Sequence, residues 1–149
     1  GAGYGGLIRN EDGYVILAYI GCSKTNSVII QELNAIYYGL KGAARVGATK
    51  LLVASDSMRP VNIINGEEAP PWYGRNLAAV ILLLSKDFGH FSIKHHFRET
   101  NRATDYLAGL GCATDFCSRV DGEAFHDDLY SCSLQSPAYV PTGILLEEP

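Results

Sequence analysis

Three acidic residues stand where packing alone does not require an acid: Glu32, Asp56 and Asp105. Glu32 lies on the shoulder of an apolar helical stripe, with Ile29 and Ile36 as its neighbours. Asp56 directly follows a short apolar run, and ligand sites in α/β sheets gather at the carboxyl ends of such strands. Asp105 lies one turn inside a predicted helix. Because like charges repel, convergence of the three carboxylates would imply a divalent metal ion between them.

Magnesium suits this donor set, because Mg²⁺ prefers hard carboxylate oxygens and keeps waters for phosphate chemistry. Two such ions that hold the attacking and leaving oxygens are a common arrangement for phosphodiester cleavage. Each acid also has an ordinary explanation when it is taken alone. Glu32 can be a solvated helix residue, Asp56 a helix N-cap, and Asp105 a favourable charge near the positive end of a helix dipole.

The first elements that would position these acids follow from turn signals and apolar spacing. Two β-rich runs, Tyr4–Arg9 and Tyr14–Ile20, flank a turn cluster at 10–13 and predict an antiparallel hairpin. Ser27 is a suitable N-cap for the helix that follows, and Gly47 can end it. The apolar stripe of this helix consists of Ile29, Leu33, Ile36 and Leu40.

The second half of the pattern supplies two further strands and three helices. Leu51–Ala54 is apolar without alternation, which is typical of a strand buried on both faces. Ser57 can cap a short helix, and the next helix is predicted over Tyr73–Lys86. Phe91–Phe97 alternates as a strand, and a last helix begins near Asn101. The order β–β–α–β–α–α–β–α predicts one sheet with helices packed against it.

Length and composition restrict the class of protein. A chain of 149 residues with 47% apolar residues suits one domain and excludes a mainly disordered protein. The net charge of −4 excludes a strongly basic nucleic-acid binder, although a local basic patch remains compatible with it. The longest apolar run is far shorter than the roughly 20 residues that span a bilayer. No signal peptide opens the sequence, so we expect an intracellular protein without a membrane partner.

Four strings, in this order and spacing, resemble ribonuclease H of type 1. They are GYGGLIRN at 3–10, QELNAIYYGL at 31–40, VASDS at 53–57 and HHFRETNRATDYLA at 95–108. The closest variant is the plant kind related to the reverse transcriptases of non-LTR retroelements. The resemblance predicts an RNase H-like domain over residues 1–111 and a C-terminal extension over 112–149. It implies an α/β fold in which a mixed sheet carries helices on both faces.

The resemblance also assigns roles to individual residues. Glu32, Asp56 and Asp105 match the family's metal-binding acids, which hold two Mg²⁺ ions, and Mn²⁺ is the expected substitute. His95 lies where the family often carries a mobile histidine that assists proton transfer or product release; a buried strand residue is the alternative. The residues expected to contact nucleic acid are Gly5, Gly6, Ser57, Arg98 and Asn101. An ion pair of Arg98 with Glu99 or Asp105 is an equal alternative to a phosphate contact.

The activity that the resemblance implies is metal-dependent cleavage of the RNA strand of an RNA–DNA hybrid. Recognition would depend on the backbone and the 2′-hydroxyl groups, with little preference for base sequence. The alternative is a non-catalytic RNase H-like domain that binds RNA or protein within a larger assembly. A DNA-processing nuclease or integrase of related fold agrees less well with the histidine-to-aspartate spacing.

One departure from the family affects the site directly. The family carries a fourth acid on its first strand, which lies inside the sheet, and this chain enters the pattern after that strand. We therefore expect an open slot between the hairpin and Leu51–Ala54. An earlier start of the natural chain is the preferred explanation; Gly143–Leu146 or a strand from a partner chain can also fill the slot. With three of the four acids, residues 1–149 are expected to be inactive alone, and not to fold alone as a complete domain.

Overall fold

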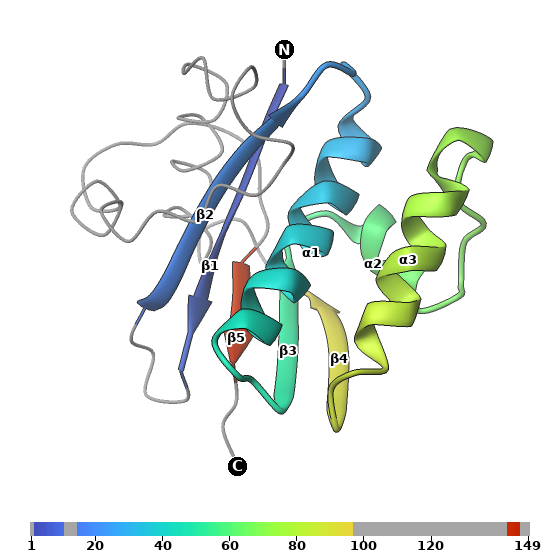
Figure 1. Cartoon of the computed structure of the whole chain (residues 1–149). Coiled ribbons are helices and arrows are strands. Elements are labelled where there is room, and N and C mark those ends of the chain that lie inside the picture. The colour runs from blue at the N-terminus through green and yellow to red at the C-terminus, as the bar shows by residue number, and fades with distance from the viewer. Residues whose placement is uncertain (1, 11–14, 97–142, 147–149) are drawn as a thin grey trace.

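The computed structural model describes residues 2–10, 15–96 and 143–146. These residues form a mixed five-stranded sheet with helices packed against it, which confirms the predicted α/β class (Figure 1). The strands are β1 (Ala2–Arg9), β2 (Val15–Ser23), β3 (Lys50–Ser55), β4 (His90–His95) and β5 (Gly143–Leu146). The helices are α1 (Val28–Arg45), α2 (Met58–Ile64) and α3 (Arg75–Ser85), and a 3₁₀ turn, η1, covers Trp72–Gly74. The strand order across the sheet is β2-β1-β5-β3-β4.

The predicted hairpin is present, and its two strands are longer than the sequence indicated. Glycines face tyrosines across it, because Gly6 pairs with Tyr19 and Gly21 pairs with Tyr4. A Cβ atom on either glycine would overlap the ring of the opposite tyrosine. The hydroxyl of the buried Tyr19 donates a hydrogen bond to the backbone oxygen of Ala35 in α1, which joins the hairpin to the helix.

Helix α1 begins and ends where the sequence predicts. Ser27 occupies the N-cap position, but its side chain makes no capping hydrogen bond. The backbone amide of Ser27 donates a hydrogen bond to the hydroxyl oxygen of Thr25 at 3.1 Å. This bond forms a turn over residues 25–27, directly before the helix. Gly47 lies just beyond the C-cap at φ +82°, a left-handed conformation that favours glycine. The predicted stripe is buried along its length: Ile29, Leu33, Ile36 and Leu40.

Of the next two helices, α2 agrees with the prediction and α3 begins later than predicted. Helix α2 follows Ser57 and is closed by Gly66 at φ +80°, as expected. The predicted start at Tyr73 is wrong, because α3 begins at Arg75. The amide of Gly74 donates to the carbonyl oxygen of Pro71 at 2.8 Å, a bond over three residues that makes this segment a 3₁₀ turn. No helix of the described residues is long and apolar enough to cross a membrane.

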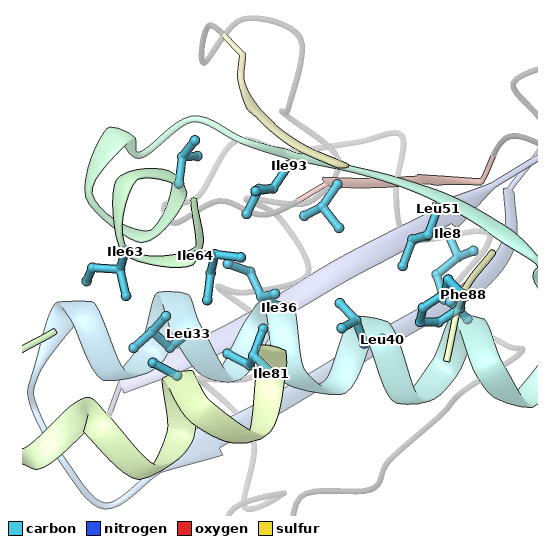
Figure 2. Packing of buried hydrophobic residues seen from close by; sticks show 14 of the residues in the cluster. Ile8, Leu33, Ile36, Leu40, Leu51, Ile63, Ile64, Ile81, Phe88 and Ile93 are labelled. Atoms are coloured by element: carbon cyan, nitrogen blue, oxygen red, sulfur yellow. The ribbon is translucent and has the colours of Figure 1, made fainter. Parts of the chain in front are cut away.

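The hydrophobic core lies between the sheet and the helices, with α1 at its centre (Figure 2). Helix α3 packs against α1 through Ile81, which is fully buried, and α2 contributes Ile63 and Ile64. The strands supply Ile8, Leu51, Val53 and Ile93. The helix predicted from Asn101, and with it the expectation of helices on both faces, lies outside the described residues.

The slot between β1 and β3 is filled by β5, the internal segment that the sequence offered as one candidate (Figure 1). Strand β5 runs parallel to β1, with Ile144 opposite Ile8. It runs antiparallel to β3, where it pairs with Leu51–Ala54. The preferred explanation, an earlier start of the natural chain, stays a prediction.

Candidate functional site

The turn that leaves the carboxyl end of β3 carries Asp56. The strand before it is packed inside the domain, since Leu51, Val53 and Ser55 are all completely buried. The Ser55 hydroxyl oxygen accepts a hydrogen bond from the amide of Ser57 at 3.2 Å, which closes the turn around Asp56. The Oδ1 atom of Asp56 is shielded from solvent. The N-cap of α2 is Ser57, so the alternative that Asp56 serves as the cap is wrong.

Glu32 in α1 is buried, with 7% of its surface exposed, so the alternative of a solvated helix residue is also wrong. Its carboxylate is hydrogen-bonded by the side chain of Ser57 and lies within electrostatic range of Asp56. Burial raises the pKa of Glu32 above its ordinary value, and the charge of Asp56 raises it further. The Ser57 hydrogen bond and the positive charge of Arg59 act in the opposite direction. Two acids that are distant in the sequence therefore meet at one turn.

His95 ends β4 directly beside the turn. The parallel pairing of β3 and β4 places it opposite Ser55. Its Nε2 atom lies 3.0 Å from the backbone oxygen of Asp56. A carbonyl oxygen can only accept, so Nε2 carries the proton in this contact. His95 is thus a strand residue, but it is half-buried and not fully buried as its alternative explanation held. Its proton-transfer role stays a prediction.

The other predicted contact residues divide into three groups. Ser57 belongs to the turn, where its side chain bonds Glu32. Gly5 and Gly6 are buried strand residues, and the ring of Tyr19 fills the space above the helix-facing side of Gly6. A nucleic-acid contact on that side of Gly6 is therefore closed off by the tyrosine. The remaining predicted site residues lie outside the described part of the chain: Asp105, Arg98 and Asn101.

The carboxylates of Glu32 and Asp56 suit a hard divalent cation. Mg²⁺ commonly takes one or two protein carboxylates and keeps waters at its other positions. A buried carboxylate beside a second acid is costly unless a proton or a cation offsets the charge. Within residues 2–10, 15–96 and 143–146, no three histidine, cysteine or acidic side chains gather into a metal cluster. The donors that the structure describes are therefore these two acids.

Arg59 is a member of this region that the sequence reasoning did not identify. It forms an ion pair with Glu68 at 2.9 Å, and its charge also reaches Glu32. The available signal was its position in the first turn of α2, two residues after Ser57. The positive charge of Arg59 offsets part of the negative charge of the two acids.

Comparison with known proteins finds a matching family model and several solved structures of similar fold. A family model described as reverse transcriptase-like matches residues 1–111. The N-terminal RNase H domain of a Mycobacterium tuberculosis protein, solved as a fusion with maltose binding protein, has a TM-score of 0.69 at 19% identity, covering 75% of this chain and 91% of that chain. RNase H1 from the halophilic archaeon Halobacterium salinarum has a TM-score of 0.61 at 22% identity, covering 69% of this chain and 79% of that chain. No curated protein matches this chain.

Proposed function

From the premise that this chain belongs to the reverse transcriptase-like family and has the RNase H fold, we propose that it binds an RNA–DNA hybrid and cleaves the RNA strand with divalent metal ions. The observation that carries this proposal is the meeting of Glu32 and Asp56 at the carboxyl end of β3. Such a pair is costly as a purely structural feature and useful as a cation site. The resemblance to the plant variant extends the proposal to a retroelement-derived domain.

The described residues would have different roles in such a site. Glu32 and Asp56 would hold the cation, and the sequence match adds Asp105 as the third acid. A bound Mg²⁺ would supply an activated water and stabilise the oxygen that leaves the phosphate. Ser57 holds the carboxylate of Glu32 by a hydrogen bond, and Arg59 lies near enough to balance part of its charge.

The test is a cleavage assay with a hybrid whose RNA strand is labelled. It uses a version of the protein that also carries the family's first strand and its acid, because residues 1–149 hold only three of the four acids and are expected to be inactive alone. We expect cleavage with Mg²⁺ or Mn²⁺ that is lost with EDTA and absent for single-stranded RNA and duplex DNA. Asp56→Asn should abolish it, since the variant lacks the charge that binds the cation. Glu67→Gln is the matched control, because Glu67 is an exposed acid in the loop after α2. Cleavage by Asp56→Asn at the parental rate would show that the assignment is wrong.

A second function, a non-catalytic RNase H-like domain within a larger assembly, is favoured by the composition of β5. The family resemblance places an acid on the strand in this slot, and β5 reads Gly-Ile-Leu-Leu. The strand that fills the slot thus brings no carboxylate to the site. Fluorescence anisotropy with the labelled hybrid separates the two functions: binding without cleavage in both Mg²⁺ and Mn²⁺ supports the non-catalytic domain.

A further inference from the structure

The peptide unit between Asp56 and Ser57 is held at both of its polar ends. Its carbonyl oxygen, from Asp56, accepts a hydrogen bond from Nε2 of His95 at 3.0 Å. Its N–H group, from Ser57, donates to the hydroxyl oxygen of Ser55 at 3.2 Å. The C=O and N–H bonds lie in the peptide plane and point in opposite directions, so hydrogen bonds to both groups fix how that plane is turned.

The sheet explains why His95 is available for this contact. Strands β3 and β4 pair in parallel register, which sets His95 opposite Ser55. The amide of His96 then donates to the backbone oxygen of Ser55 at 2.8 Å and continues the pairing past the end of both strands. With its backbone fixed there, the ring of His95 needs to reach only one residue further, to the oxygen of Asp56.

The orientation of this peptide plane sets where both neighbouring side chains start. Asp56 precedes the plane and Ser57 follows it, so the two hydrogen bonds restrict the torsion ψ of Asp56 and the torsion φ of Ser57. A change in either torsion alone would move the carboxylate relative to the hydroxyl. The Ser57 side chain is the group that bonds Glu32. The geometry of the two acids relative to each other therefore depends on the plane that His95 and Ser55 hold.

We propose that His95 is a positioning residue, which together with Ser55 clamps the Asp56–Ser57 peptide and thereby fixes the two acids in a cation-binding arrangement. The clamp itself follows from the contacts of the described residues, while its use for a cation rests on the proposed function. This role differs from the proton transfer that the family resemblance implies for His95. It requires a hydrogen-bond donor at the position of Nε2 and does not require a group that exchanges protons during turnover.

Substitutions of His95 separate a clamp from a proton shuttle. The amide nitrogen of glutamine reaches about as far as Nε2, so His95→Gln retains a donor but cannot act as an acid or base near neutral pH. His95→Ala removes the donor, and Ser55→Ala removes the acceptor at the other end of the plane. His90→Ala is the matched control, because His90 is exposed at the opposite end of β4.

Two readouts are independent of cleavage. The first is the hydrogen exchange of the Ser57 amide, followed by NMR in metal-free protein at one fixed pH. The second is the affinity for Mn²⁺, measured by calorimetry. We expect His95→Ala and Ser55→Ala to speed the exchange and to weaken Mn²⁺ binding about tenfold, the lower end of what residues that hydrogen-bond metal ligands contribute. His95→Gln and His90→Ala should stay within about twofold of the parental protein, against that tenfold loss.

Each contrary result has a definite meaning. If His95→Gln and His95→Ala both keep Ser57 exchange and Mn²⁺ affinity but lose cleavage, His95 transfers protons and the clamp is overturned. Equal losses in His95→Gln and His95→Ala would also overturn it, since a retained donor would then be of no use. If the parental chain binds no Mn²⁺, the proposed function fails while Ser57 exchange still decides the clamp. Should His95→Ala not fold, His95→Gln and Ser55→Ala carry the same comparison.

Discussion

Strand β5 is the element whose loss we expect to destabilise the fold most. It lies between β1 and β3, so a variant without residues 143–149 leaves the facing edges of two strands open. Ile144→Pro tests the same contact without shortening the chain, because proline has no N–H to donate and is disfavoured inside a sheet. The matched controls are a variant that lacks only 147–149, beyond the strand, and Glu148→Pro.

The size of the effect follows from the pairing with β3. Four residues of β3, Leu51 to Ala54, pair with β5 in antiparallel register. Every second residue of such a ladder exchanges both its N–H and its C=O bond, so about four hydrogen bonds are lost on this side alone. Buried groups left unpaired cost about 1–3 kcal/mol each, which gives roughly 4–12 kcal/mol in all. That loss is comparable with the roughly 5–15 kcal/mol by which a domain is stable.

Urea denaturation followed by far-UV circular dichroism measures this loss. We expect no cooperative transition, or a greatly lowered midpoint, for the variant without 143–149 and for Ile144→Pro. The two control variants should unfold like the full chain. A cooperative transition of the deletion variant at the parental midpoint would refute the reasoning, because the slot would then contribute no stability.

Two further predictions concern α1 and the hairpin. Burial raises the pKa of Glu32 above its ordinary value, so Glu32 contributes stability that is present below the unfolded-state pKa and is lost as the pH rises through the folded-state pKa. Glu32→Gln should therefore be more stable than the parental metal-free protein at neutral pH, and equal pH dependence of urea unfolding in the two proteins would contradict this. Gly6→Ala should cost about 1–3 kcal/mol through overlap with the Tyr19 ring. Gly89→Ala, where a Cβ would have ordinary contacts, is the control, and equal melting temperatures would refute the overlap.

The sequence predicted those elements whose signals are local. The stripe of α1 repeats at helical spacing, and the run Leu51–Ala54 lacks any polar alternation, so both were found close to their observed bounds. The start of α3 was missed by two residues for an equally local reason. Apolar spacing does not show that the Gly74 amide bonds Pro71, which makes the preceding turn a 3₁₀ turn.

The sequence singled out Glu32 and Asp56, which lie near each other in the structure, but it did not predict what surrounds them. A residue on the shoulder of a helical stripe can face either solvent or core, which left Glu32 undecided. In the structure Glu32 is buried, and it contacts the turn after β3. That turn lies more than twenty residues further along the chain, so the local sequence does not indicate the contact. The contact between His95 and the Asp56 carbonyl likewise depends on the register of β3 with β4, a pairing that no local pattern specifies.

The composition of β5 indicates a buried strand, but it does not determine the direction in which the strand runs between β1 and β3. Since β5 is parallel to β1 and antiparallel to β3, the two flanking strands run in opposite directions. A strand in this slot therefore forms one parallel and one antiparallel ladder whichever way it runs. The observed direction gives β5 its longer ladder with β3 in the antiparallel form, which is slightly more stable per residue. In either direction the residues are Gly, Ile, Leu and Leu, so the carboxylates of the site must come from outside the slot, beginning with Glu32 and Asp56.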